Sequence, residues 1–371
     1  MYLHTDHNRY LFNCGETSQK VITEYVGSNS LSQLTNIFVT SKTWNNIGGL
    51  PGMCLSIRGA GSPDVRLHGP VGIMKMYEAT ENFVILFDFR VMYHNPENEP
   101  VYSDSAITVK HVPLKAEIDK PIISPEPKYC KWVPDMDFTN KGVTGGVQNE
   151  IDTTVYAYIV TINGRPGKIN MEKCAALGIR PGPVIGMLKS GKSIKLDNGN
   201  IVKSEDVTEE PEEASTYLVI DCPSENYVPS LLKEPLLQSD KFQDLCGIFH
   251  VSPLEVVKSE SYLNWVKSLP LDINHIMLND LSYDFGTSKL LKENAKLNKI
   301  APEVFLKMLP GEPSKVKDNT KANADFDYVS HYKEYSGKCI QGVTDMRLYC
   351  RPNKGDLFLL CLRTRKKLDF T

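Results

Sequence analysis

The chain has 371 residues, of which 41% are hydrophobic and 23% charged, enough to bury one large α/β domain or two smaller ones. Its formal net charge of −3 excludes a protein that is basic throughout, so any nucleic-acid contact must come from a local positive patch. Nine scattered cysteines without a CxxC pair argue against a zinc ribbon and a disulfide framework, and no apolar run reaches the roughly 18 residues of a membrane span. These features favour an intracellular, reducing compartment.

Short apolar strands alternate with helical segments along the chain. Strands are expected at 9–14, 34–40, 65–68, 155–162, 217–221, 247–251, 273–278 and 357–363. Helices are expected from about residue 49 and at 72–83, 227–238, 261–269 and 288–300. A strand followed by a helix, repeated, predicts an α/β fold. Two segments break the alternation, proline-rich 115–153 and polar 310–337, and both are expected to be long insertions or linkers.

The loop after the strand at 34–40 lies where catalytic residues usually sit, at the end of a strand. It contains Ser41, Thr43, Asn45 and Asn46 but no histidine, cysteine or carboxylate between Thr40 and Gly48. Zinc is held by imidazole, thiolate or carboxylate groups, so we expect this loop to bind no metal and to form a hydrogen-bonded turn.

Other histidines give no specific site. His4 and His7 of "HTDH" are spaced wrongly for one face of a strand, and surface histidines are the simpler interpretation. Four others lie at or near strand positions, where a core histidine bonded to the backbone is the usual outcome: His68, His111, His250 and His275.

Segment 164–204 is the local positive patch. It holds eight Lys or Arg residues against two acids. Arg180-Pro181-Gly182-Pro183 forms a stiff turn whose backbone can approach phosphates, and Lys189 and Lys192 follow as point charges. Charge and Pro/Gly pattern alone leave two possibilities open, an arm that grips nucleic acid and a hairpin whose lysines keep it soluble.

Several stretches in order resemble the amino-terminal half of long-form ribonuclease Z, the eukaryotic tRNA 3′-processing endonuclease. They are "RYLFNCGETSQ", "NIFVT…GGLPGM", "LHGP", "LGIRPGPVIGMLKSGK", "LDNGNIV" and "HIMLND". The resemblance implies a metallo-β-lactamase-like αββα sandwich, here a degenerate and incomplete amino half with a protruding RNA-binding arm. On the family's HxHxDH pattern, all four ligand positions are replaced, by Ser41, Thr43, Asn45 and Asn46. The arm residues implied are Arg180, Pro181, Gly182, Pro183, Gly186, Lys189 and Lys192.

The same resemblance implies a division of the chain. The degenerate domain would comprise 1–114 and 216–309, interrupted by the insertion 115–153, the strand 154–163 and the arm 164–204. A polar linker, 310–337, would precede 338–371, the C-terminal strands and the start of an inter-half linker. We expect the first strands of the sheet to be missing, which would expose an edge and make the chain aggregation-prone.

The function implied is the tRNA-binding half of an enzyme that removes 3′ trailers from precursor tRNA. Its partners would be precursor tRNA and a carboxy-terminal catalytic half. Zinc would be bound in that half and none would be bound by this chain. No residue of this chain would be catalytic. The family suggests the nucleus, the mitochondrion or both. A stand-alone, non-catalytic RNA-binding or scaffold protein is the alternative, and an unrelated metal hydrolase is a third.

Overall fold

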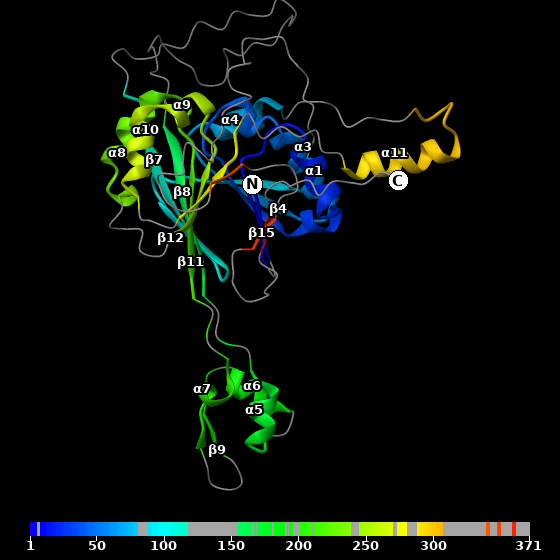
Figure 1. Cartoon of the computed structure of the whole chain (residues 1–371), viewed down its shortest axis with the longest axis vertical. Helices are drawn as coiled ribbons and strands as arrows, with labels where there is room; N and C mark the ends of the chain where they lie inside the picture. Colours follow the sequence, from blue (N-terminus) through cyan, green and yellow to red (C-terminus); the bar gives the residue numbers. More distant parts are fainter. Residues whose placement is uncertain are drawn as a thin grey trace, which may run out of the picture.

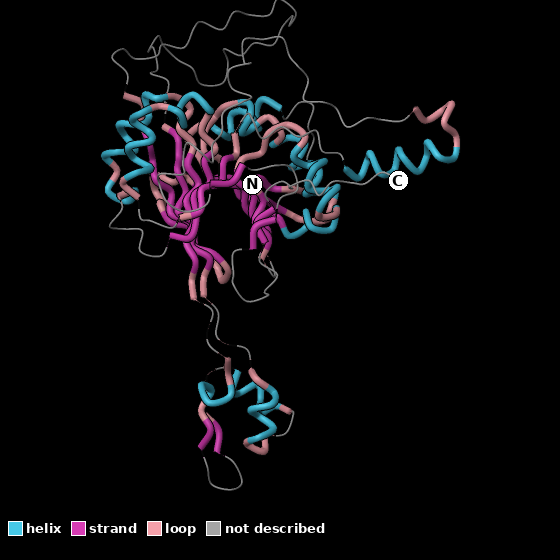
Figure 2. Tube along the Cα trace, viewed as in Figure 1, coloured by secondary structure: helices cyan, strands magenta, loops and turns pink. Residues whose placement is uncertain are grey.

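The fold is seen in a computed structural model (Figure 1). It describes residues 1–5, 8–80, 88–117, 154–164, 167, 169–179, 182–189, 191, 193–195, 201–209, 211, 213–238, 245–269, 273–279, 288–306, 339–341, 347–349 and 358–360. The insertion 115–153, apart from its first three residues, and the whole linker 310–337 lie outside these residues. Two seven-stranded sheets lie face to face, with helices on their outer faces (Figure 2), so the predicted αββα sandwich is confirmed.

The first sheet has the order β15-β16-β1-β2-β3-β4-β5. Strands β2 to β5 run parallel to one another, whereas β1 pairs antiparallel with both β2 and β16. Its strands are β1 (Tyr2–His4), β2 (Arg9–Phe12), β3 (Leu34–Phe38), β4 (Asp64–His68), β5 (Arg90–His94), β15 (Arg347–Tyr349) and β16 (Phe358–Leu360).

The second sheet has the order β14-β13-β12-β11-β8-β7-β6. Its strands are β6 (Val101–Ser103), β7 (Ile107–Leu114), β8 (Val155–Ile162), β11 (Ser215–Ile220), β12 (Leu245–His250), β13 (Asn274–Met277) and β14 (Cys339–Gln341). Strand β8 has buried apolar side chains on both of its faces. Tyr156, Tyr158 and Val160 pack between the sheets, while Val155 and Ala157 pack against the outer helices, as period-two alternation requires.

Helices cover the outer faces of both sheets. Against the first lie α1 (Ser18–Tyr25), α2 (Trp44–Ile47), α3 (Leu50–Gly59), α4 (Ile73–Thr80) and the 3-10 helix η1 (Ser28–Gln33). Against the second lie α8 (Val228–Lys233), α9 (Leu254–Lys258), α10 (Glu260–Lys267) and the 3-10 helices η2 (Glu225–Tyr227) and η3 (Pro235–Leu237). Helix α11 (Ser288–Ile300) projects from the body (Figure 1). Among the helices that the structure describes, none has the length and hydropathy needed to cross a bilayer.

The expectation that β2 lacks a neighbouring strand is wrong. Strand β1 fills that place, with Leu3 opposite Tyr10, and its other edge pairs with β16, where Leu3 lies opposite Leu359. Strands from the beginning and the end of the sequence therefore lie side by side in this sheet. The signal was weak because each of these strands is only three residues long.

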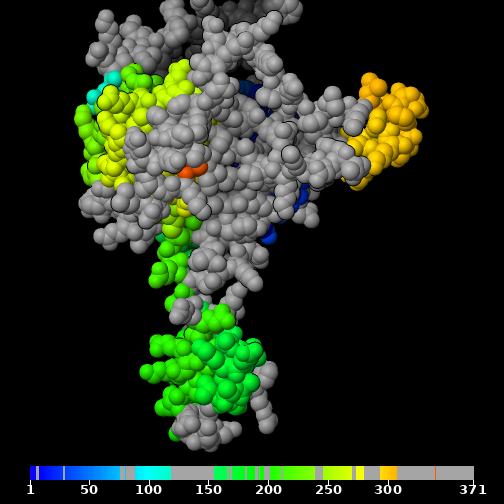
Figure 3. Space-filling view, in the orientation of Figure 1, coloured from blue at the N-terminus to red at the C-terminus, as the bar shows by residue number. Residues whose placement is uncertain are grey.

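The arm is a separate small unit at the end of β8 and β11, clear of the body (Figure 3). It contains α5 (Met171–Ala176), α6 (Pro183–Lys189), β9 (Ile194–Lys195), β10 (Ile201–Val202) and α7 (Ser204–Val207). Asn170 caps α5 by accepting hydrogen bonds from the backbone N–H groups of Glu172 and Lys173. The arm has its own hydrophobic core, formed by Cys174, Ile179, Leu188, Ile194, Val202 and Val207.

Candidate functional site

The loop after β3 meets the end of β11 at one edge of the sandwich, around the carboxylate of Asp221. Three donors converge on Asp221 Oδ2: Thr40 Oγ1 at 2.6 Å, Asn46 Nδ2 at 2.9 Å and Ser41 Oγ at 3.2 Å. All four residues are buried. Because strand ends are where α/β folds place ligands, this is the position where the chemistry of such a fold is expected.

Asn13, the residue directly after β2, holds this loop in place. Asn13, in the left-handed region at φ 59°, accepts a hydrogen bond from Thr40 N at 2.9 Å and donates to Thr40 Oγ1 at 3.0 Å. The carbonyl of Thr40 accepts a hydrogen bond from Tyr156 N at 2.8 Å, which ties the loop to the second sheet. The network is therefore anchored to both sheets.

The structure brings together part of the predicted set. Asn46 Nδ2 lies 2.7 Å from Ser41 Oγ, and Ser41 Oγ lies 3.3 Å from Thr43 Oγ1. Ser41 and Asn46 thus surround Asp221, Thr43 is exposed at the rim, and Asn45 is exposed as well. Sequence reasoning missed Asp221, although an acid directly after a buried strand was a signal that could have found it.

The electrostatics favour a closed site over a metal centre. Burial raises the pKa of the Asp221 carboxyl above 3.8, while hydrogen bonds from Thr40, Asn46 and Ser41 oppose that rise. Asp221 is the one ligand-type group in this cluster, and neutral donors occupy its Oδ2. A protein zinc site uses several such ligands, and the cluster offers one.

The raised pKa predicts a pH effect on stability. Because the folded chain holds the Asp221 proton more tightly than the unfolded chain, the stability from that proton is lost as pH rises from about 3.8 through the folded-state pKa. Asp221→Asn cannot titrate there. We therefore expect the unfolding free energy of the wild type, relative to this variant, to fall as pH rises from 4 to 7 in urea titrations. The exposed Glu213→Gln serves as control, and a relative stability that rises with pH would contradict the desolvation account.

The structure describes some of the predicted arm residues. Gly182 and Pro183 are exposed at the start of α6, and Gly186 is exposed within it. Apart from chain neighbours and the helix backbone, no atom of the described residues lies within 4 Å of a Cβ added at either glycine. Lys189 ends α6. Arg180, Pro181 and Lys192 lie outside the described residues.

Five of the histidines that the structure describes form two buried groups. His250 Nε2 lies 3.0 Å from His275 Nδ1. His68 and His111 lie with His94, which sequence reasoning did not single out, as a group of three that could hold a metal. The predicted backbone bond exists for His111, whereas the His68 ring contacts side chains. His4 is half-buried in β1, and His7 lies outside the described residues.

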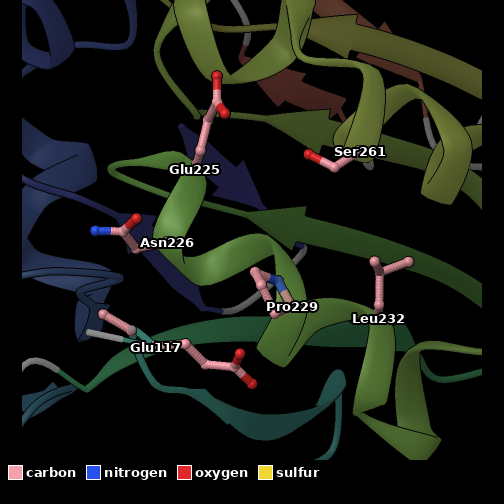
Figure 4. Close-up of a pocket in the computed structure, with 7 residues that line it drawn as sticks. Glu117, Glu225, Asn226, Pro229, Leu232 and Ser261 are labelled. Carbon is pink, nitrogen blue, oxygen red and sulfur yellow. The ribbon is translucent and has the colours of Figure 1, made fainter. Parts of the chain in front are cut away.

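A surface pocket of about 710 Å³ lies beside α8 and α10 (Figure 4). It is lined by Ala116, Glu117, Glu225, Asn226, Pro229, Leu232 and Ser261. Glu117 forms an exposed ion pair with Lys233. Its lining includes the carboxylates of Glu117 and Glu225 and the hydroxyl of Ser261, but no histidine, cysteine or basic side chain.

Comparison with known proteins finds relatives named as ribonuclease Z. A family model described as tRNase Z endonuclease matches residues 1–49. "Ribonuclease Z, mitochondrial" from Drosophila melanogaster is 33% identical over 370 residues, covering 96% of this chain and 44% of that protein. The chain is thus similar to ribonuclease Z over nearly its whole length. This confirms the resemblance drawn from the sequence motifs.

Further ribonuclease Z relatives agree. "Zinc phosphodiesterase ELAC protein 2" from Homo sapiens is 27% identical over 332 residues, covering 82% of this chain and 39% of that protein. The crystal structure of a long form RNase Z from yeast matches with a TM-score of 0.53 at 18% identity, covering 82% of this chain and 38% of that chain, and supports the fold. The chain thus spans less than half the length of these ribonuclease Z relatives.

Proposed function

We propose that this chain is the amino-terminal, tRNA-binding half of a ribonuclease Z that removes 3′ trailers from precursor tRNA. The observation that carries the proposal is the pairing of a degenerate site, closed around Asp221, with a separately folded basic arm. Two further features support it, the family and the coverage of less than half of each relative.

In this proposal, grip and catalysis are divided between two halves. The arm binds the tRNA backbone through Arg180, Lys189 and Lys192, and Gly182 and Gly186 let the backbone approach phosphates closely. A carboxy-terminal half supplies the zinc ions, which activate water for attack on the phosphodiester. The αββα body of this chain holds the arm at the end of β8 and β11.

The same proposal covers the compartment. The Drosophila relative and "tRNAse Z TRZ4, mitochondrial" from Arabidopsis thaliana carry mitochondrial names. We propose the mitochondrion on this ground, with the nucleus as a second compartment implied by the family resemblance. A stand-alone RNA-binding protein is the alternative, and a downstream reading frame that carries HxHxDH would decide against it.

The proposal predicts that the purified chain releases no trailer from 3′-labelled precursor tRNA, with or without added zinc. The reason is that hydroxyl and amide groups stand at all four ligand positions of the loop, Ser41, Thr43, Asn45 and Asn46. A complete ribonuclease Z with an intact HxHxDH pattern is the positive control. Trailer release by this chain that disappears in Asp221→Asn would contradict the degenerate-site proposal.

A further inference from the structure

Three buried histidines meet between the sheets, at a place that shares no residue with the Asp221 network. His68 ends β4, His94 ends β5 and His111 lies in β7 of the opposite sheet. All three are buried, and one ligand nitrogen from each lies within 4.8 Å of the others. The parallel register, in which His68 lies opposite His94, brings the first two together.

The hydrogen bonds of the rings fix their tautomers. His111 Nδ1 lies 3.0 Å from the carbonyl of Pro100, which can only accept, so Nδ1 carries the proton and Nε2 keeps its lone pair. His94 Nε2 lies 2.8 Å from the carbonyl of Glu99, so by the same reasoning His94 Nδ1 keeps its lone pair.

The tautomer of His68 follows from three successive hydrogen bonds, which link Asp104, Tyr102, Asn36 and His68. Tyr102 donates to Asp104 Oδ2, so its hydroxyl oxygen accepts from Asn36 Nδ2 at 2.9 Å, which orients the Asn36 amide. Asn36 Oδ1 is therefore the acceptor facing His68 Nε2 at 2.9 Å. His68 Nε2 must donate, and His68 Nδ1 keeps its lone pair.

These tautomers leave two ring nitrogens without a proton between them: the lone pair of His68 Nδ1 meets that of His111 Nε2 at 3.3 Å. Two lone pairs facing each other in a buried site are unfavourable unless a cation lies between them. His94 Nδ1 lies 3.2 Å from the carboxylate Oε2 of Glu99, a contact that is an ion pair when His94 is protonated and a pair of ligand atoms when a metal ion lies between them.

We propose that His68 Nδ1, His94 Nδ1, His111 Nε2 and the Glu99 carboxylate form a zinc-binding site. Zn–N bonds of about 2.0–2.1 Å at the tetrahedral angle place two ligand atoms about 3.3 Å apart, close to both separations above. Each imidazole donates its other ring N–H to a carbonyl or amide oxygen, the arrangement that orients metal-ligating histidines in proteins.

Glu99, the fourth proposed ligand, lies at the surface, where a zinc ion can enter the site. The Glu99 side chain is 73% exposed, whereas the His94 side chain is 5% exposed. The loop from Asn95 to Pro100 supplies Glu99 and the carbonyls that orient His94 and His111. Because the ligand nitrogens spread over up to 4.8 Å, zinc binding draws His94 and Glu99 inward. This site departs from the sequence expectation that the chain binds no zinc.

The test is metal binding by the full chain, followed with Zn²⁺ and with Co²⁺ as a spectroscopic probe. We expect one ion per chain, visible d–d absorption typical of tetrahedral Co²⁺ with nitrogen and oxygen ligands, and a rise in Tm on zinc addition. Glu99→Gln, which changes an exposed side chain, should raise the zinc Kd at least about tenfold. Its matched control is Glu97→Gln in the same loop, which should leave binding unchanged.

A second pair of variants keeps the result interpretable. His111→Gln should abolish binding, whereas His275→Gln, in the other buried histidine pair, should retain it. Asp221→Asn should also retain the ion, which separates this site from the proposed function. The proposal is overturned if the folded wild type takes up no ion, if His111→Gln binds as well as the wild type, or if ¹⁵N NMR of zinc-treated protein shows a proton shared by His68 and His111.

Discussion

Replacing residues 163–214 with an Asn-Gly turn should abolish tRNA binding while leaving the body folded. Ile162 of β8 lies directly opposite Ser215 of β11 in an antiparallel pair, so a two-residue turn can join them. The arm has a core separate from those of the body, so its removal opens no cavity there. We expect the Kd for tRNA at low salt to rise at least about 100-fold, because the proposed function assigns most of the phosphate contacts to the arm. Fluorescence anisotropy with labelled tRNA measures this.

The control for arm removal changes charge elsewhere. Replacing Lys292, Lys296 and Lys299 of α11 with Ala removes three positive charges outside the arm and should leave tRNA affinity nearly unchanged. Thermal unfolding of the arm-less chain checks that the sandwich persists. An arm-less chain that is folded and still binds tRNA tightly would place the RNA-binding surface on the body.

The second large effect is on the salt dependence of binding. Segment 164–204 has a surplus of six positive charges in a chain of net charge −3. Each phosphate neutralised by Lys or Arg releases counterions and adds somewhat under one unit to the slope of log K against log[salt]. Changing Arg180, Lys189 and Lys192 to Ala should therefore lower the slope by about two to three units and weaken binding to all tRNAs alike. Salt titrations on several tRNAs measure both quantities.

A charge-neutral variant separates charge from shape. Gly182→Val adds a β-branched side chain at an exposed position where no atom lies within 4 Å of the added Cβ, so the arm itself should tolerate it. If the backbone there approaches phosphates, affinity should fall while the salt slope stays near that of the wild type. An unchanged slope and affinity in the triple variant would show that its lysines and arginine only solvate the arm.

Local pattern predicted much of the fold. The strand predicted at 155–162 has the same bounds as β8, and the helix predicted at 288–300 has the same bounds as α11. Both elements are long enough for their pattern of apolar residues to be recognised within one short stretch of sequence. The three-residue strands β1 and β16 were harder, because their pairing joins Tyr2 to Leu360 across nearly the whole chain.

The candidate sites were also hard to predict where they join residues that are far apart in the sequence. That the loop after β3 lacks metal ligands follows from residue identity alone, since Ser41 and Asn46 cannot replace imidazole. The sequence could mark Asp221 as an acid directly after a buried strand, but it could not place Asp221 beside this loop, because the two lie 175 to 181 positions apart along the chain. His94 and Glu99 acquire meaning only when the register of β4 and β5 brings His94 beside His68.

We propose above all that the arm holds tRNA. Photocross-linking of the full chain to precursor tRNA substituted with 4-thiouridine, followed by mass spectrometry of the linked peptides, tests it most directly. We predict linked peptides from residues 164–204, with Lys189 and the turn at Gly182 among them and an intact 3′ trailer on the recovered RNA. Cross-links confined to the sandwich body, with none in 164–204, would contradict the account.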